Sequence, residues 1–296
     1  MPDRQYPSLK TWLIAGLIFV SLFVVLHVLA LKFNDDILQK KQKVEAAYLL
    51  RHVMQQARQD AKDKRVVVLG SSLIGQGISC SEEFSDSSFR QIRLSKIFLN
   101  THRGVLKTFT EIHGFDSLLL HPPDILLIEV DQLAYRIEQD QTLSERFSTG
   151  AVFLRNVKTT AAFGIANYRM PEYCGKIIHE TIADTVWETN THWQPLTFND
   201  HGEVHPYLQQ LQKLGVRLVM VHVPRPGVSE AAIHTGSREK EFLSVVQAYQ
   251  QAYGMEYWNY PHLLPFTYFY DQGHLNKRGR MLYSNWLYSK LEKESR

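Results

Sequence analysis

The strongest hydrophobic stretch of the chain lies near its start, at residues 12–31. These twenty residues, WLIAGLIFVSLFVVLHVLAL, include no charged side chain, and Lys10 and Lys32 stand on either side of them. Twenty helical residues at about 1.5 Å each match the roughly 30 Å hydrocarbon core of a bilayer. The pattern predicts a transmembrane helix rather than the buried helix of a soluble core.

A cleaved signal peptide is the alternative explanation of this stretch. Arg4 and Lys10 suit the charged start of such a peptide, but the apolar run is longer than usual and no small-x-small cleavage site follows it. An uncleaved anchor is the better interpretation. The lysines that follow the apolar stretch carry at least as much positive charge as the residues before it. Charge alone therefore does not decide which end of the helix faces the cytoplasm.

Beyond the anchor, residues 35–62 carry apolar side chains at steps of three and four, among them Val44, Ala47, Tyr48 and Met54. This spacing predicts a stalk helix that can also be the first helix of the following domain. The chain accordingly divides into a tail, an anchor, a stalk and a folded domain, at residues 1–11, 12–31, 32–64 and 65–296.

Within the folded domain, short β-branched or aromatic runs alternate with helical ones. The expected strands are residues 66–69, 92–99, 125–130, 217–223 and 255–259. The expected helices are residues 104–120, 206–214 and 238–253. This alternation is typical of a parallel sheet with helices on both faces, so we predict an α/β domain with one five-stranded sheet.

Residues 133–203 interrupt this rhythm. The segment is polar with scattered aromatics, including Tyr168, Tyr173, Trp187 and Trp193. Because insertions at the carboxyl ends of strands build the ligand crevice of α/β folds, it is a candidate lid or acceptor-binding subregion. A helical excursion that merely covers the sheet is the alternative.

Composition and charge narrow the class of protein. With 296 residues, 44% hydrophobic and 21% charged, the chain has ordinary globular composition. A net charge of +3 without a long basic run gives no reason to expect a nucleic-acid partner. Two cysteines, Cys80 and Cys174, are too few for a disulfide framework; they either pair with each other or are small core residues.

Two motifs carry the candidate chemistry. The first, VVVLGSSLIGQG at residues 66–77, is a strand that runs into a turn rich in glycine and serine. In a parallel sheet such a turn lies at the edge where ligands bind, and a helix that follows it offers backbone N–H groups to an oxyanion. Taken alone, this motif also fits phosphate-binding or purely structural turns.

The second motif is YFYDQGHLNKRG at residues 268–279, in which Asp271 and His274 are three residues apart. A serine hydroxyl needs an imidazole to take its proton and an acidic group to orient that imidazole. The Asp-x-x-His spacing lets the carboxylate address one ring nitrogen while the other nitrogen faces a serine. Together the two motifs predict a serine nucleophile with a histidine base.

These motifs resemble the SGNH or GDSL-type hydrolases, and more narrowly a membrane-anchored branch that acts on cell-envelope polymers. Gly70-Ser71-Ser72-Leu73 is similar to the family's Gly-Asp-Ser-Leu block, with Ser71 in the Asp position. Residues 271–276 followed by Gly279 are similar to its final block. The resemblance covers about residues 66–291 and implies Ser72 as nucleophile, His274 as base, Asp271 as its orienter, and a flavodoxin-like three-layer α/β/α sandwich.

The same resemblance implies an oxyanion hole that this sequence keeps only in part. The Ser72 amide and the Gly104 amide are its expected donors. At the third strand, where the family has Gly-x-Asn-Asp, Asp131 stands near the Asn position, and a carboxylate donates no hydrogen bond unless it is protonated. This departure weakens the expectation of ordinary esterase activity.

Other candidate residues carry less weight. Arg225, in the Pro-Arg-Pro run after the fourth strand, is a candidate contact for an anionic or carbonyl group, with a structural role as the alternative. His201 and His205 flank Glu203, but their order is not that of the HExxH zinc proteases. His222 and the remaining histidines form no evident constellation, so we expect no metal and no cofactor.

The resemblance implies a membrane-tethered acyl-ester enzyme. In this hypothesis Ser72 takes up an acyl group, such as acetyl, and passes it to an extracytoplasmic polysaccharide or other envelope polymer. Relatives of this branch sit in the bacterial inner membrane beside a multi-pass acyltransferase, which implies such a partner and a periplasmic domain. An esterase or deacetylase of the same fold and a non-catalytic assembly subunit are the alternatives.

Overall fold

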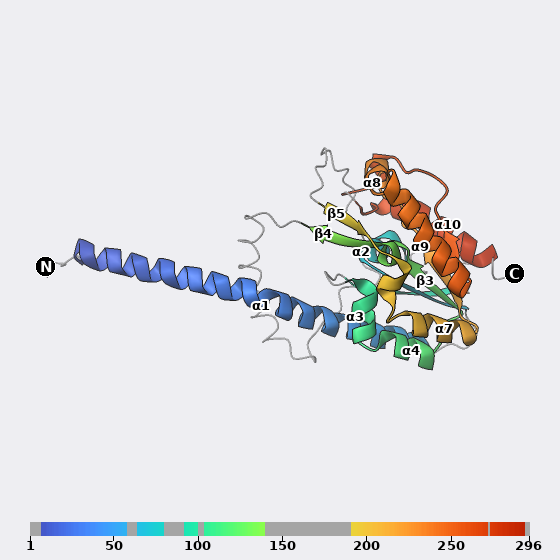
Figure 1. The fold of residues 1–296 in the computed structure, drawn as a ribbon, viewed down its shortest axis with the longest axis horizontal. Helices are drawn as coiled ribbons and strands as arrows, with labels where there is room; N and C mark the ends of the chain where they lie inside the picture. The colour runs from blue at the N-terminus through green and yellow to red at the C-terminus, as the bar shows by residue number, and fades with distance from the viewer. Residues whose placement is uncertain are drawn as a thin grey trace. The chain divides into compact units, whose positions relative to one another are not determined.

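The computed structural model describes residues 7–57, 64–79, 92–99, 104–139, 191–271 and 273–293 (Figure 1). These residues form two units, which are considered separately. One comprises residues 7–41, and the other comprises residues 42–57 together with the later described residues.

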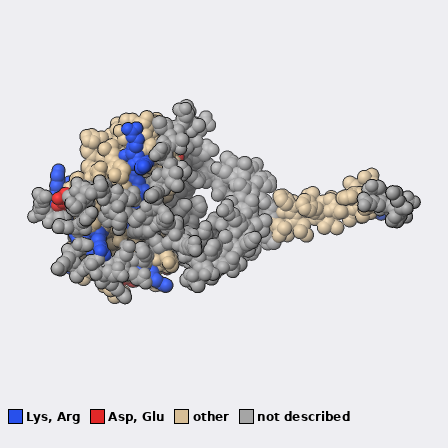
Figure 2. Space-filling view, turned by 180° about the vertical axis from the view of Figure 1, so that it is seen from behind, with Lys and Arg blue, Asp and Glu red and all other residues tan. Residues whose placement is uncertain are grey.

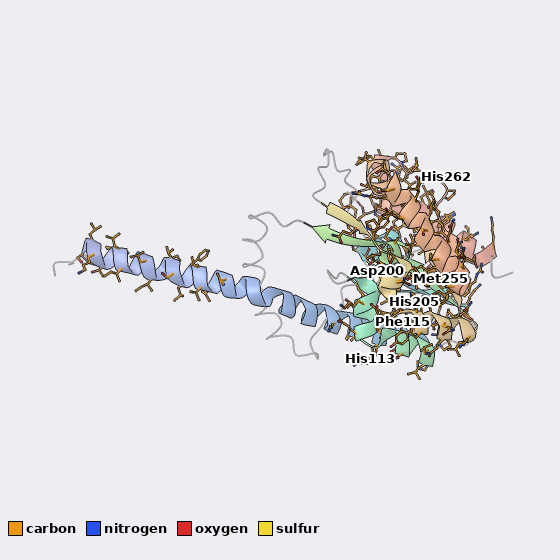
Figure 3. The ribbon with its side chains drawn as sticks, viewed as in Figure 1. His113, Phe115, Asp200, His205, Met255 and His262 are labelled. Carbon is orange, nitrogen blue, oxygen red and sulfur yellow. The ribbon has the colours of Figure 1, made fainter. Side chains whose placement is uncertain are left out.

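Helix α1 (Leu9–Ala57) runs without a break from the apolar stretch into the stalk. Between Leu9 and Leu26 it is long and apolar enough to cross a membrane, with a mean hydropathy of 2.3, and it is the one such helix in the described part of the chain. Figure 2 shows this part of α1 as a tan segment, and Figure 3 shows its side chains projecting outward. None of it is buried, unlike a core helix, so it suits a membrane anchor or a signal sequence.

The folded unit contains a five-stranded parallel sheet, as the sequence predicts. Its strands lie in the order β2-β1-β3-β6-β7, with every neighbouring pair parallel. They are β1 (Lys64–Gly70), β2 (Ile92–Phe98), β3 (Ile125–Glu129), β6 (Arg217–Val221) and β7 (Glu256–Trp258). Each begins and ends within two residues of its expected bounds. The prediction succeeds because the interior strands carry compact apolar runs, as in β3, where all five residues are buried, and because the edge strand β2 starts with an alternation of buried and less buried residues.

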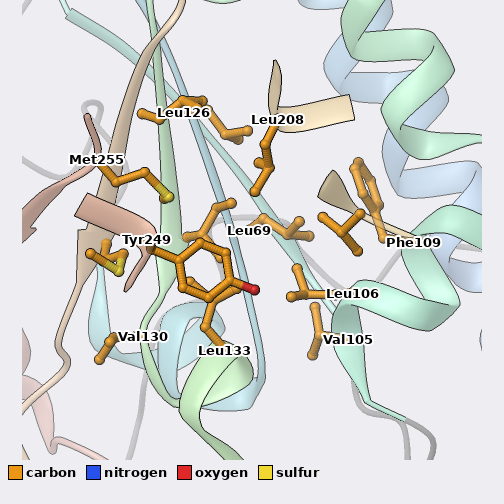
Figure 4. Packing of buried hydrophobic residues seen from close by; sticks show 14 of the residues in the cluster. Leu69, Val105, Leu106, Phe109, Leu126, Val130, Leu133, Leu208, Tyr249 and Met255 are labelled. Atoms are coloured by element: carbon orange, nitrogen blue, oxygen red, sulfur yellow. The ribbon is translucent and has the colours of Figure 1, made fainter. Parts of the chain in front are cut away.

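Helices cover both faces of the sheet. Along β1, Val67 and Leu69 join one hydrophobic cluster while Val66 and Val68 join another, as the two-residue period of a strand requires. The first cluster, part of which Figure 4 shows, also takes in residues of the end of α1, of the short α5 (Asp131–Ala134), and of the longer helices α3 (Val105–Glu111), α4 (Gly114–Leu120), α7 (His205–Lys213) and α9 (Ser237–Tyr253). The second takes in residues of α2 (Ser72–Gly77) and α10 (Lys277–Lys293).

One predicted helix is wrong. Residues 104–120 form two helices, α3 and α4, because His113 between them adopts the left-handed conformation with φ of 58°. Helices α8 (Gly227–Ile233) and α10 have no counterpart among the expected elements. The folded unit also contains the short 3-10 helices η4 (Phe198–His201) and η5 (Phe266–Tyr268), the short helix α5, and a pair of antiparallel strands that is described next.

The two ends of the expected insertion lie side by side. After α5 (Asp131–Ala134), strand β4 (Tyr135–Gln139) pairs antiparallel with β5 (Thr191–Pro195), so that Ile137 is opposite Trp193. Residues 140–190, which include Tyr168, Tyr173, Trp187 and Cys174, lie outside the described residues. Cys80 also lies outside them. The lid and the cysteine pairing therefore stay predictions.

Candidate active site

Ser72 lies at the carboxyl edge of the sheet, two residues after the end of the interior strand β1. The strand ends at Gly70, Ser71 caps the following helix, and Ser72 is the first residue of α2. A Cβ atom on Gly70 would lie 2.2 Å from the Ile74 side chain and 2.5 Å from a carboxylate oxygen of Glu129. Glycine is required here because the turn packs its backbone directly against these two side chains.

His274 and Asp271 lie on a tight loop that comes much later in the chain, just before α10. The backbone N–H groups of Gly273 and His274 both donate to Asp271 Oδ1, at 3.0 and 2.8 Å. Phe269 and Leu275 form a β-bridge at the base of the loop, and both are buried in the second cluster. The loop thus holds the carboxylate in one position beside the imidazole.

Asn276 and Gly279, which follow the Asp–His pair in the second motif, have structural roles. Asn276 Oδ1 accepts the N–H groups of Arg278 and Gly279 at 3.0 and 3.1 Å, which caps the start of α10. A Cβ atom on Gly279 would lie 2.3 Å from the backbone oxygen of Tyr268. Both residues hold the loop that contains Asp271 and His274 against the start of α10.

The fold brings Ser72, His274 and Asp271 into one hydrogen-bonded chain. His274 Nε2 lies 2.9 Å from Ser72 Oγ, and His274 Nδ1 lies 2.7 and 2.8 Å from the two Asp271 oxygens. An ionised carboxylate only accepts, so Nδ1 carries the proton in this arrangement. Nε2 is then free to accept the hydroxyl proton of Ser72.

The Asp271 carboxylate stays ionised in this loop. Partial burial raises its pKa, but the hydrogen bonds from the His274 ring and from the backbone N–H groups outweigh burial and hold the pKa below its ordinary value. The His274 side chain is 22% exposed, so the imidazole beside the serine is reachable from solvent. The chain of groups is therefore ordered and accessible.

Glu129 is a residue of this region that the sequence analysis missed. It closes strand β3, is fully buried, and accepts the Ser71 N–H at 2.6 Å and the Ser71 hydroxyl at 2.9 and 3.0 Å. Ser71 Oγ in turn accepts the N–H of Leu73 at 3.2 Å as the cap of α2. Ser71 is thereby turned to Glu129, while Ser72 is turned to His274. A single acidic residue at the end of an apolar strand is the signal that points to such a role.

Burial raises the pKa of Glu129, and the nearby Asp131 carboxylate acts in the same direction. The Ser71 N–H, the Arg225 charge and a hydrogen bond from Gln132 act in the opposite direction without reversing the shift. Glu129 therefore holds a proton more readily than an exposed glutamate.

Two further contacts hold the turn at Ser72 in place. Tyr270 donates a hydrogen bond to Gln76 of α2, and its ring stacks on the His274 ring at 5.6 Å. On the other side, the buried Lys96 Nζ donates to the carbonyls of Gly75 and Ile78 at 3.1 and 2.7 Å. A cation at the carboxyl end of a helix complements its free carbonyl groups.

The remaining expected site residues are not brought to Ser72 by any contact among the described residues. Asp131 and Arg225 pair with each other in the interior, where their side chains are 1% and 3% exposed. Gly104 is exposed just before α3, with φ of 89°. His205 Nε2 lies 3.0 Å from the carbonyl oxygen of Phe198, so it is engaged within η4 and α7 (Figure 3).

No protein-family model matches the chain, and a search of curated proteins gives no match either. The roles of the site residues accordingly rest on the geometry of the fold.

Proposed function

We propose that this chain is a membrane-tethered serine acyl-ester enzyme, and that it transfers an acyl group such as acetyl to a polysaccharide or other polymer outside the cytoplasm. The observation that carries the proposal is the hydrogen-bonded chain Ser72–His274–Asp271. A serine and a histidine placed 2.9 Å apart, with a carboxylate on the far ring nitrogen, form the arrangement that activates a hydroxyl for attack on an ester.

The fold supports the same proposal. Numbered along the chain, the five parallel strands follow the order 2-1-3-4-5, which is the order of flavodoxin-like doubly wound domains. With helices on both faces, this order supports a flavodoxin-like three-layer sandwich of the SGNH kind. Ligands of such sheets bind at the carboxyl ends of the strands, which is the edge that carries Ser72.

The reaction would proceed in two steps. Ser72 Oγ attacks the carbonyl carbon of the donor ester while His274 Nε2 takes the hydroxyl proton and passes it to the departing alcohol. The acyl-serine is then attacked by an acceptor hydroxyl, whose proton moves to His274 Nε2 and finally to Ser72 Oγ as the new ester leaves. Asp271 stabilises the imidazolium that forms in each step. The amide of Ser72 is the proposed oxyanion donor, while the expected contribution of Gly104 stays a prediction.

One feature sets this site apart from ordinary esterases, and a second favours transfer over hydrolysis. Asp131, the residue at the expected Asn position, accepts a hydrogen bond from Arg225 and offers no donor to an oxyanion. The apolar start of α1 would tether the domain to a bacterial inner membrane with the domain outside, next to a multi-pass acyltransferase that delivers the acyl group. A tether raises the effective concentration at such a partner without a strong contact.

The test is acylation of the full chain in detergent with an activated acetyl ester, with and without oligosaccharides. We expect an acetyl adduct on Ser72, its absence in Ser72→Ala, its persistence in Ser71→Ala, and acetylated sugar when acceptor is present. An adduct that survives Ser72→Ala would refute the proposed nucleophile. Acetate as the sole product with every acceptor would show a hydrolase instead. Polymer acylation in cells that is unchanged by Ser72→Ala would show an assembly subunit.

A further inference from the structure

A second cluster of polar side chains lies where β6 leaves the sheet and α8 begins. It consists of His222, Glu230 and His234, whose ligand atoms all lie within 4.8 Å of one another. None of the three belongs to the chain of groups around Ser72. Local sequence patterns do not reveal this cluster, because His222 stands eight positions before Glu230.

His222 presents a lone pair to this cluster. Its side chain is 8% exposed, and its Nδ1 lies 2.9 Å from the Asn259 amide oxygen, an atom that only accepts. Nδ1 therefore carries the ring proton, and Nε2 is left as an acceptor. Nε2 is buried without a hydrogen-bond partner and lies 3.3 Å from Glu230 Oε1. Two buried acceptors that face each other at this distance need a cation between them, either a proton on the imidazole or a metal ion.

The other two side chains come from one face of α8. Glu230 and His234 are four residues apart, and His234 Nε2 lies 3.3 Å from Glu230 Oε2. The His234 ring packs edge-on against the Phe242 ring at 4.7 Å, which fixes its direction. For bonds of about 2.0–2.1 Å to zinc, ligand atoms at the corners of a tetrahedron lie about 3.3–3.4 Å apart. The two measured separations, one to each oxygen of Glu230, match this spacing, and the remaining pairs of ligand atoms lie within 4.8 Å.

Outer contacts orient these side chains as they do in metal sites. Asn259 holds His222 through Nδ1, and the backbone N–H of Arg225 donates to Glu230 Oε1 at 2.9 Å. The Arg225 guanidinium lies 3.9 Å from the same oxygen and forms its closer ion pair with Asp131. Each Glu230 oxygen also faces an imidazole nitrogen, so the carboxylate is placed to share a cation with both rings.

We propose that His222, Glu230 and His234 bind a divalent transition-metal ion of the zinc class, with a fourth position open to water. Two imidazoles and one carboxylate form a donor set that zinc binds in proteins. The ion would fasten α8 to the ends of β6 and β7, since His222 directly follows β6 and Asn259 directly follows β7. The proposal does not depend on the acyl chemistry at Ser72.

The test is metal binding by the full chain in detergent after chelator treatment, with Zn²⁺ and Co²⁺ as the probes. We expect one equivalent to bind, the melting temperature to rise, and Co²⁺ to show the visible absorption of a tetrahedral site. Glu230→Gln and His234→Ala should each weaken binding at least about a hundredfold. His262→Ala, which removes an exposed histidine outside the cluster (Figure 3), should bind as the wild type does.

A spectroscopic readout on the wild type guards against variants that fail to fold. Bound Co²⁺ should shift two exchangeable histidine N–H resonances, one of them from the His222 Nδ1–H. Binding that persists unchanged in folded Glu230→Gln and His234→Ala would overturn the proposal, because the ion would then lie elsewhere. Failure of the wild type to bind one equivalent would overturn it too and would leave a protonated His222 paired with Glu230.

Discussion

Ser71 and Ser72 are neighbours of identical chemistry, and their partners separate their roles. The Ser71 hydroxyl donates to the buried Glu129 and caps α2, whereas the Ser72 hydroxyl faces His274 Nε2. The Ser71 hydroxyl is directed into the interior, to a buried carboxylate and to the cap of α2, whereas the Ser72 hydroxyl meets an imidazole that is reachable from solvent. The contacts therefore favour Ser72 as the nucleophile of the proposed reaction.

Replacing Asp271 by asparagine should slow acylation by about 10³–10⁴-fold with little change in fold. An amide can turn its NH₂ group toward His274 Nδ1, and the ring proton then moves to Nε2, where it blocks acceptance of the Ser72 proton. The measurement is the rate of adduct formation with an activated ester, together with circular dichroism.

A matched control for this variant lies on α4. Asp116 Oδ2 is 3.0 Å from His113 Nδ1, again three residues away, but this pair is exposed on the surface. Asp116→Asn should leave the rate unchanged. Equal losses in both variants would mean that the Asp271 effect is not specific to the site.

The pH dependence of stability provides a second test at Asp271. Its pKa in the folded protein lies below the ordinary value of 3.8, so its contacts stabilise the fold above that pH and lose their contribution as the pH falls through the folded value. The gap in melting temperature between wild type and Asp271→Asn should be widest near neutral pH and close below about pH 3.8. A gap that widens in acid would contradict the assignment.

At the scale of elements, the candidate site depends on how short pieces are held. Helix α2 has six residues and would not be stable alone, since isolated helices shorter than about 12–15 residues are marginal in water. The Ser71 cap secures its start and Lys96 secures its end, while Tyr270 connects it to the Asp–His loop. The position of Ser72 therefore depends on β2, β3 and α10 as much as on its own segment.

Gly279→Ala should test how tightly the Asp–His loop packs on α10. The new methyl group would meet the Tyr268 backbone oxygen at 2.3 Å, and a backbone atom cannot rotate away. We expect a loss of about 1–3 kcal/mol or more in unfolding free energy, despite the better helix propensity of alanine. Chemical denaturation measures it.

Gly202→Ala is the control for this substitution. Gly202 has helical φ and ψ of −51° and −33°, and its nearest contact would be an ordinary 3.6 Å. The unfolding free energy of the Gly202→Ala variant should differ from that of the wild type by no more than about 0.5 kcal/mol. If Gly279→Ala were equally neutral, the loop would be less tightly packed than the structure indicates.

At the scale of the whole molecule, α1 belongs to both units. Its first part has exposed apolar side chains, whereas Leu50 and Val53 near its end are buried in the first cluster. The exposed ion pair between Lys43 and Glu111 adds little to this packing.

Two truncations should separate these parts. Removal of residues 1–41 should yield a protein that needs no detergent and melts as the full chain does. Removal of residues 1–57 should lower the unfolding free energy by several kcal/mol, because each buried Leu or Val side chain contributes about 1.5–3 kcal/mol. Differential scanning calorimetry makes the comparison, and the double variant Leu50→Ala, Val53→Ala controls for burial alone. Equal stability of the two truncated proteins would show that the end of α1 is not part of the domain.

The amino-acid sequence by itself determined the apolar helix and the five strands, because hydrophobic runs and their period are local properties of a chain. It also pointed to Ser72, Asp271 and His274 through local motifs. The buried roles of Glu129, Asp131 and Arg225 were decided by tertiary structure, because each depends on partners distant in sequence. Ser72 and His274 are 202 residues apart, and their 2.9 Å contact exists because the sheet aligns the ends of its strands with the loop before α10.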